Sequence, residues 1–259
     1  MTALLRTEAI TKAYGGVQAL SGATVAVEEG TVAGLIGPNG SGKTTLFNVI
    51  TGYARPDAGQ VLFRDRAITG YAPDKVFAAG IGRTFQLTRI FPRLTVIENM
   101  LIAAQSRDRP KNLLAGFGRG AWTQHRRHAQ ELLAFAGIER HAEVLAGSLS
   151  YGQRKLLELA YVLVADPAVL LLDEPAGGVN PTLINHIADR IRLLNAQQGK
   201  TFLLVEHNME FVMGLCSTIT VLESGADVVS GPPEIVRTDK RVLDAYLGTD
   251  VDEEEEDAQ

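Results

Sequence analysis

Apolar residues recur along the chain in two spacings, one typical of strands and one typical of helices. Short apolar or alternating runs predict strands at residues 3–10, 22–30, 31–36, 59–68, 168–173 and 200–206. Apolar residues three and four positions apart predict helices at residues 95–106, 124–137, 152–165 and 181–198. Two runs nearer the end of the chain, residues 217–225 and 226–231, predict a β-hairpin. Strands and helices therefore alternate over most of the sequence.

This order predicts an α/β fold in which helices cover a mostly parallel sheet, with antiparallel β strands near the start of the chain. Residues 89–166 show helical spacing without a clear strand, so we expect a helical subdomain inserted into the α/β core. The length of 259 residues alone is compatible with one large domain or two modest ones. We interpret residues 1–248 as a single domain and residues 249–259 as a separate acidic tail.

The composition is that of a globular protein with a substantial core, since 46% of the residues are hydrophobic and 21% are charged. No apolar run approaches the roughly 20 residues that a membrane-spanning helix needs, and residues 1–10 lack the pattern of a secretory signal. The single cysteine, Cys216, excludes an internal disulfide and fits a reducing compartment. These features favour a cytoplasmic protein.

The net charge of −5 comes from the end of the chain. The last ten residues contain seven acidic side chains, and without them 25 basic residues face 23 acidic ones. Such a tail is typical of a disordered, solvating end, with partner binding as the alternative. Residues 107–128 hold six Lys or Arg and one acid, which indicates a solvated, variable insertion or a contact with lipid head groups or a membrane partner. Neither the charge nor the aromatic spacing indicates nucleic-acid binding.

The strongest motif is "GPNGSGKTT" at residues 37–45, between the apolar strand "VAGLI" and the helical segment "TLFNVITG". This context identifies a phosphate-binding loop and hence a P-loop NTPase core. The glycines let the backbone bend around a phosphate, and successive N–H groups form an anion-binding nest. Lys43 supplies a positive charge for the outer phosphates, and Thr44 supplies a hydroxyl for Mg²⁺. The expected ATP-binding residues of the loop are Gly37, Pro38, Asn39, Gly40, Ser41, Gly42, Lys43, Thr44 and Thr45.

Two adjacent carboxylates, Asp173 and Glu174, follow four aliphatic residues at the end of a predicted strand. In P-loop proteins an aspartate at this place holds Mg²⁺, and a neighbouring cation lowers the free-energy cost of its charge. Because Pro175 disfavours a continuing strand, we expect Glu174 at the mouth of the strand, where it meets the nucleotide. Taken alone, the acids would be interpreted as capping carboxylates on a loop. Beside a phosphate-binding loop, we interpret them as a metal ligand and a water-activating base.

Further motifs follow in an order that resembles the ATP-binding-cassette (ABC) ATPases. The segment "LSYGQ" at residues 149–153 resembles the signature of that family and lies upstream of "VLLLDE". Gln86 falls at the family's Q-loop, His207 in "LLVEHNM" matches its switch histidine, and Tyr14 stands where an aromatic ring stacks on adenine. Each of these residues is weak evidence alone. All five motifs in order, over residues 4 to about 230, are specific.

The resemblance implies how such a protein uses ATP. Two cassettes pair head to tail around two ATP molecules, and the signature of one caps the γ-phosphate held by the P-loop of the other. Glu174 would then polarise the attacking water, and His207 would hold the γ-phosphate geometry. The implied Mg²⁺ ligands are Thr44, Gln86 and Asp173. The implied residues that bind ATP in trans are Ser150, Tyr151, Gly152 and Gln153.

Two departures from the family pattern concern contacts between paired cassettes. Tyr151 replaces the commoner glycine of the signature, while Ala176 and Asn180 stand where many members have Thr or Ser and Asp. Both departures, together with "GRTFQLTRIFPRLTVIENML" and "AYLG", resemble the longer of the two distinct ATPase subunits of branched-chain amino-acid importers. The resemblance implies transmembrane permease subunits, a second and different ATPase subunit and a separate solute-binding protein as partners, at the cytoplasmic face of the cell membrane.

Three classes of function compete on the sequence. The leading interpretation is the ATPase of a membrane importer for hydrophobic amino acids, with amides, urea or an exporter as alternatives within that class. A soluble ABC protein of translation or repair usually carries two cassettes or a long coiled-coil insertion, and this sequence has neither. A P-loop kinase would lack "LSYGQ" and His207 in this order.

Overall fold

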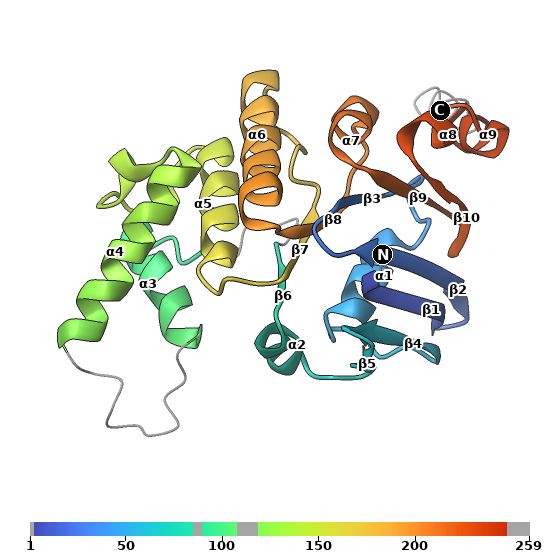
Figure 1. Ribbon diagram of the computed structural model, residues 1–259, viewed down its shortest axis with the longest axis horizontal. Coiled ribbons are helices and arrows are strands. Elements are labelled where there is room, and N and C mark those ends of the chain that lie inside the picture. Colours follow the sequence, from blue (N-terminus) through green and yellow to red (C-terminus); the bar gives the residue numbers. More distant parts are fainter. Residues whose placement is uncertain (1–2, 85–89, 108–118, 248–259) are drawn as a thin grey trace.

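Two β-sheets form the centre of the fold, which a computed structural model describes for residues 3–84, 90–107 and 119–247 (Figure 1). The smaller sheet is antiparallel and has the strand order β2-β1-β4-β5. It consists of β1 (Ala3–Tyr14), β2 (Val17–Glu28), β4 (Ala58–Phe63) and β5 (Arg66–Ala67). The predicted antiparallel strands at the start of the chain are thus confirmed, although β1 runs four residues further than its alternating pattern indicated.

The larger sheet has the strand order β10-β9-β3-β8-β7-β6, and its strands are parallel except for the edge strand β10. Its members are β3 (Val32–Ile36), β6 (Ile81–Arg83), β7 (Val169–Asp173), β8 (Thr201–Val205), β9 (Thr218–Glu223) and β10 (Ala226–Gly231). This order confirms the predicted mostly parallel sheet and the hairpin at residues 217–231. In the register, Asp173 lies opposite Val205, so β7 and β8 end at the same edge.

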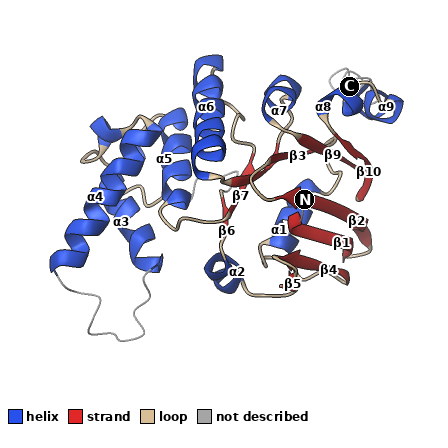
Figure 2. Cartoon of the chain, in the orientation of Figure 1, coloured by secondary structure: helices blue, strands red, loops and turns tan. Residues whose placement is uncertain are grey.

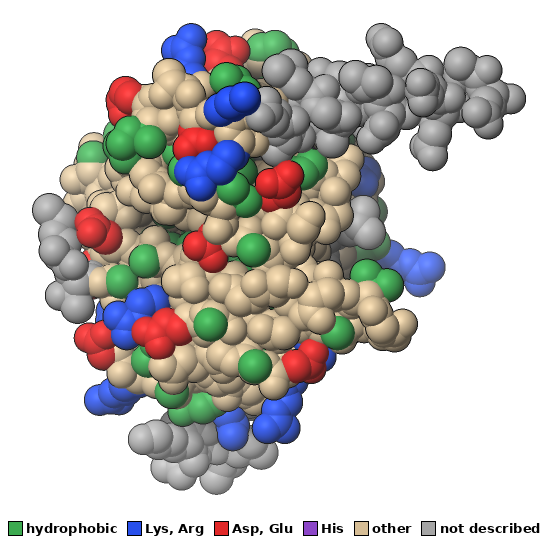
Figure 3. Space-filling view, turned by 90° about the vertical axis from the view of Figure 1, so that its right-hand side faces the viewer, with side chains coloured by type: hydrophobic (Ala, Val, Ile, Leu, Met, Phe, Trp, Pro, Cys, Tyr) green, Lys and Arg blue, Asp and Glu red, His purple; other side chains and the backbone are tan. Residues whose placement is uncertain are grey.

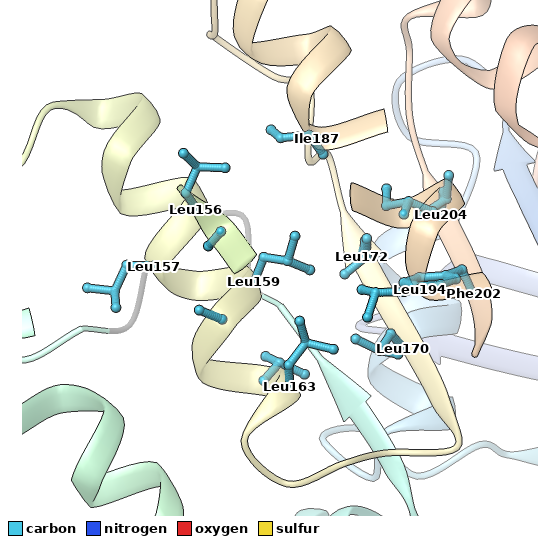
Figure 4. Close-up of a cluster of buried hydrophobic side chains, with 14 of the residues drawn as sticks. Leu156, Leu157, Leu159, Leu163, Leu170, Leu172, Ile187, Leu194, Phe202 and Leu204 are labelled. Carbon is cyan, nitrogen blue, oxygen red and sulfur yellow. The ribbon is translucent and has the colours of Figure 1, made fainter. Parts of the chain in front are cut away.

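Successive residues of the central strands enter two different cores, as the pleat of a strand requires. In β7, Val169 and Leu171 pack with the antiparallel sheet and helix α1 (Lys43–Ile50). Leu170 and Leu172 pack on the opposite face against α5 (Tyr151–Leu163) and α6 (Pro181–Gln198) (Figure 4). Burial on both faces explains why these strands have continuous apolar runs in the sequence.

The helices divide according to these two cores (Figures 1 and 2). Helix α1 lies between the two sheets, whereas α5 and α6 cover the other face of the parallel sheet. Between β6 and β7 the chain forms α3 (Val96–Arg107) and α4 (Arg119–Ala136), two short 3₁₀ turns and α5, and this helical region lies at one end of the molecule in Figure 1. The remaining helices are α2 (Pro73–Ala79), α7 (Met209–Leu215), α8 (Pro233–Val236) and α9 (Lys240–Leu247).

The sequence pattern missed several short elements, namely β6 and the helices α2, α7, α8 and α9. A strand of three residues or a helix of one or two turns offers too few positions for an apolar period to be recognised. None of the helices in the described ranges is long and apolar enough to cross a membrane. On the face seen from the right-hand side of Figure 1, acidic and basic side chains are interspersed and hydrophobic ones are scattered, as expected for a nearly neutral body (Figure 3).

Candidate active site

The loop between β3 and α1 has the backbone geometry that its glycines predicted. Gly37 has φ 150°, Gly40 has φ 75° and Gly42 has φ 102°, values that L side chains rarely adopt. A Cβ at Gly37 would lie 2.0 Å from the carbonyl oxygen of Leu222, and one at Gly42 would lie 2.5 Å from that of Ala19. Glycine is therefore required here both by conformation and by close approach. Gly42 is the N-cap of α1, so the N-terminus of that helix opens onto the loop.

Lys43 lies within this loop rather than pointing into solvent. Its Nζ donates to the carbonyl oxygens of Gly37 (2.7 Å) and Pro38 (2.8 Å), and its side chain is largely buried. Burial lowers the pKa of Lys43, while the negative charges of Glu174 and Asp173 oppose that shift. The ammonium group is therefore already desolvated and lies within electrostatic reach of both carboxylates.

Asp173 has a cation from the chain itself beside it, Arg83, which the sequence did not lead us to expect. Oδ2 of Asp173 accepts a hydrogen bond from Nη2 of Arg83 at 2.8 Å, and both side chains are buried. Nη1 of Arg83 also donates to Oδ1 of Asn48 (2.7 Å) on α1 and to Oγ1 of Thr51 (3.1 Å), the C-cap of that helix. Arg83 thus joins β6, β7 and α1. The sequence analysis missed it because β6 was not recognised as a strand.

The second carboxylate oxygen of Asp173, Oδ1, is the atom that could bind the expected Mg²⁺. Oδ1 is buried and has no hydrogen-bond partner among the described residues, and the Thr44 side chain is exposed at the start of α1. A free carboxylate oxygen and a hydroxyl are the hard oxygen donors that Mg²⁺ prefers, so these residues fit the ion. Gln86, the third expected ligand, lies outside the described residues.

Glu174 turns away from the strand, as Pro175 predicted. β7 ends at Asp173, and Glu174 has a left-handed φ of 49°, while its N–H donates to the carbonyl oxygen of Val205 at 2.9 Å. Oε1 of Glu174 lies 2.8 Å from Nε2 of His207, at hydrogen-bond distance. The side chains are 22% and 42% exposed, so this pair is open to a ligand. Two residues that the sequence assigned separately therefore meet at one place.

Two buried charged residues surround the turn at Glu174, and the sequence analysis singled out neither. Nζ of Lys155, on α5, donates to the carbonyl oxygen of Glu174 at 3.0 Å. The carboxylate of Glu206, directly after β8, accepts from the N–H of Ala176 at 2.5 Å. The sequence signal for Glu206 was present, because it is a lone acid after five apolar or neutral residues and directly follows β8, as Glu174 directly follows β7.

The signature residues form the start of α5. Ser150 is the N-cap, its Oγ accepts from the N–H of Gln153 (3.3 Å), and Oε1 of Gln153 accepts from the N–H of Ser150 (2.9 Å). This capping box satisfies two of the free donors at the helix start. A Cβ at Gly152 would lie 2.2 Å from Cδ2 of Leu183, so glycine lets α5 approach α6 closely.

Tyr151 and Asn180, two of the three residues that depart from the family pattern, line one open groove with Ser150 and Gly178. The ring of Tyr151 is 47% exposed and lies against Gly178, where an added Cβ would be 3.2 Å from it. Oδ1 of Asn180 accepts from the N–H of Leu183 at 2.9 Å and caps α6, which an amide does as well as a carboxylate. In the described contacts, the signature is joined to α6 and residues 178–180 rather than to the P-loop.

Tyr14 is the last residue of β1, opposite Val17 across the Gly15–Gly16 turn. Its ring is 48% exposed, and Nζ of Lys12 lies 5.2 Å from the ring centroid. About half of the residue is therefore accessible to a base, as stacking requires.

Comparisons with known proteins agree with this arrangement. Residues 20–177 match the family described as ABC transporter. The high-affinity branched-chain amino acid transport ATP-binding protein BraF of Pseudomonas aeruginosa is 38% identical over 250 residues, which cover 95% of this chain and 98% of BraF. The ADP conformation of MJ1267, an ATP-binding cassette of an ABC transporter, is 33% identical with a TM-score of 0.83, covering 96% of this chain and 100% of that chain. A dimeric post-hydrolysis state of the cassette MJ0796, bound to ADP and Pi, is 25% identical with a TM-score of 0.77, covering 88% and 98%.

The family match extends over more than half of the chain and includes the P-loop, the signature and the two carboxylates at the end of β7. The similarity to BraF and to MJ1267 extends over almost the full length of each. The chain therefore belongs to the ABC transporter family, as an ATP-binding cassette that hydrolyses ATP.

Proposed function

We propose that this cassette powers the import of branched-chain or other hydrophobic amino acids and works at the cytoplasmic face of the cell membrane. The observation that carries the choice of solute is the likeness to BraF over almost the whole of both chains. Two residues that depart from the general family pattern, Tyr151 and Asn180, are built into this fold as a groove wall and a helix cap. They are consistent with a specialised subfamily rather than with a damaged site.

The catalytic residues in this proposal are Glu174 and His207. Glu174 accepts a proton from the water that attacks the γ-phosphate, and the imidazole of His207, 2.8 Å from Oε1, keeps that carboxylate and the phosphate in a fixed relation. Lys43 exchanges its loop carbonyl acceptors for oxygens of the outer phosphates. Hydrolysis then depends mainly on position and charge stabilisation, which a site of fixed backbone groups supplies.

Thr44, Gln86 and Asp173 hold Mg²⁺ in this proposal. The ion would neutralise part of the negative charge on the β- and γ-phosphates. The orphaned Oδ1 of Asp173 supports this role, because a buried carboxylate oxygen without a donor is costly unless a cation or water reaches it. Arg83 donates to the other oxygen at 2.8 Å, which leaves Oδ1 as the oxygen available to the ion.

The groove at Ser150, Tyr151 and Asn180 supports a head-to-tail dimer. The start of α5 lines this groove, and no described residue of this chain fills it. The N-terminus of a helix favours an anion. We assign it to the γ-phosphate of ATP bound by a second, different ATPase subunit. In that arrangement the signature residues Ser150 to Gln153 act in trans.

An exposed apolar patch formed by Phe91, Val144 and Leu145 supports a permease contact. The segment that follows the Q-loop region pairs with residues 144–147, since the N–H of Ala146 donates to Leu94 and the N–H of Gly147 donates to Pro92. The three side chains are 40–53% exposed, and an apolar group of this kind marks protein contacts. We assign it to an intracellular segment of a transmembrane subunit.

The solute is tested by purifying the chain with its membrane partners and its solute-binding protein, and by measuring phosphate release in proteoliposomes. Leucine, isoleucine or valine should stimulate hydrolysis, whereas urea and short amides should not. Stimulation by urea or an amide alone would replace the proposed solute with the second candidate. Hydrolysis that no solute stimulates would contradict the importer role.

The permease contact is tested with single cysteines at Phe91 and Leu145, which should crosslink to a membrane subunit. The native thiol does not interfere, because Cys216 is buried and burial raises its pKa to about 12. A cysteine at Ile235, equally exposed on α8 at the other end of the molecule in Figure 1, is the matched control and should not crosslink. Crosslinks from Ile235 but not from Leu145 would place the partner elsewhere.

A further inference from the structure

Glu206 is a buried acid at the edge of the sheet where the catalytic residues lie. It directly follows β8 and is only 2% exposed. Burial raises the pKa of Glu206 most strongly, the negative charge of Glu174 raises it further, and backbone N–H groups lower it. An acid that is costly to bury and lies beside a catalytic pair calls for an explanation beyond packing.

Its two carboxylate oxygens accept from two different loops. Oε1 accepts from the N–H of Ala176 at 2.5 Å, in the turn that begins at Glu174. Oε2 accepts from the N–H of His207 at 3.2 Å. A single side chain thus bridges the loop after β7 and the loop after β8. A carboxylate is suited to this task, because it offers acceptors on both sides and no donor.

The turn at Glu174 needs such support. A non-glycine residue with φ 49° is in the left-handed region, which costs about 1 kcal/mol or more and persists only where surrounding contacts hold it. The N–H of Gly177 donates to the carbonyl oxygen of Glu174 at 3.1 Å and closes the turn. Within this turn, the N–H of Ala176 donates to the carboxylate of Glu206. This turn directs the Glu174 side chain to within 2.8 Å of the His207 ring.

We propose that Glu206 is a positioning residue that sets the contact between Glu174 and His207. It fixes the backbone of both residues, one through Ala176 and one through His207 itself. The proposal concerns this chain's own residues and holds whichever solute the transporter carries.

The test measures the contact directly by following the His207 ring resonances in NMR spectra of the full chain, assigned with a His207→Ala variant. In the wild-type background, Glu174→Gln should shift those resonances. In a Glu206→Ala background the same substitution should leave them unchanged, because the two side chains no longer meet. The matched control is Glu210→Gln, an exposed acid in the first turn of α7, which should preserve the shift.

Kinetics give a second readout in the assembled transporter. Glu206→Ala should lower kcat by about tenfold or more, equivalent to about 1.4 kcal/mol of transition-state stabilisation, with unchanged ATP affinity because the P-loop contacts are untouched. Glu206→Gln should lie between, since its amide oxygen still accepts one of the two N–H groups.

Three results would overturn the proposal. These are a persistent Glu174→Gln shift in folded Glu206→Ala, a wild-type kcat in that variant, or an equal loss of kcat and ATP affinity, which would indicate a general structural role. If Glu206→Ala does not fold, the near-isosteric Glu206→Gln carries the same NMR and kinetic tests.

Discussion

The P-loop and the signature both lie at helix starts, yet the first is closed by contacts within its own chain and the second is open. In the P-loop, Lys43 is bonded to carbonyl oxygens of Gly37 and Pro38 and is buried. In the signature, Ser150 caps its own helix, and Tyr151 is about half exposed where it lines the groove. We therefore expect the P-loop to bind a nucleotide by itself, and the signature to form half of a site between two cassettes.

This difference separates two kinds of measurement. We call the P-loop together with Glu174 the P-loop half, and the segment from Ser150 to Gln153 the signature half. Changes in the P-loop half should alter ATP binding or turnover both in the isolated chain and in the assembled transporter. Changes in the signature half should alter stability or the assembled transporter, and should leave ATP affinity of the isolated chain unchanged.

The largest effect is expected from Glu174→Gln, which sharpens the comparison inside the P-loop half. Glutamine keeps size and hydrogen-bonding reach but loses the charge that activates water, so turnover should fall by about 100-fold or more. ATP binding should persist. Steady-state phosphate release and ATP-dependent dimerisation measure the two properties, in the assembled transporter where the isolated chain stays monomeric. A wild-type rate would reduce Glu174 to a carboxylate at a strand end.

Lys43→Ala and Ser150→Ala compare the two halves directly. Lys43→Ala removes charged hydrogen bonds worth about 1.5–3 kcal/mol, so ATP affinity of the isolated chain should fall about ten- to 100-fold. Ser150→Ala should leave that affinity unchanged and lower stability by about 1 kcal/mol through loss of the N-cap. Calorimetric titration with ATP measures the affinity of both variants, and thermal unfolding measures their stability. Equal losses of affinity would mean that the two halves are not separate.

Gly152→Ala tests the close approach of α5 and α6. The added Cβ would lie 2.2 Å from Leu183, so repacking should destabilise the chain by about 1–3 kcal/mol. Gly214→Ala is the control, because its Cβ would meet only Nη2 of Arg192 at 4.0 Å and alanine favours the helix α7. Thermal unfolding should separate the two variants, and a stable Gly152→Ala would show that Leu183 yields freely.

The smallest effect is expected at Tyr14. Stacking on adenine contributes about 1 kcal/mol or somewhat more, so Tyr14→Ala should weaken ATP binding by roughly fivefold. Tyr14→Phe keeps the ring face and should bind nearly as the wild type does. Fluorescent-nucleotide titration distinguishes the two, and identical affinities would remove Tyr14 from the nucleotide site.

The sequence was sufficient for the parallel sheet, the P-loop and the turn at Pro175, because each has a local pattern or a residue with restricted conformation. It was insufficient for Arg83, Lys155 and Glu206, since their roles depend on partners 19 to 90 positions away, as in the pairing of Arg83 with Asp173. It also gave no sign of Arg83 as a second cation beside Asp173, because an arginine on an unrecognised strand has no visible partner in the sequence. Long-range pairing of this kind follows from strand order, which periodicity alone does not determine.

The alternation of β7 between two cores has a consequence for how the chain unfolds. Leu170 and Leu172 belong to the core under α5 and α6, while Val169 and Leu171 belong to the core around α1. Because one five-residue strand contributes to both cores, displacement of β7 removes apolar contacts from both of them at once. The helical region and the P-loop core should therefore lose structure in one cooperative transition, so that a packing defect beneath the signature also lowers the population of chains able to bind ATP.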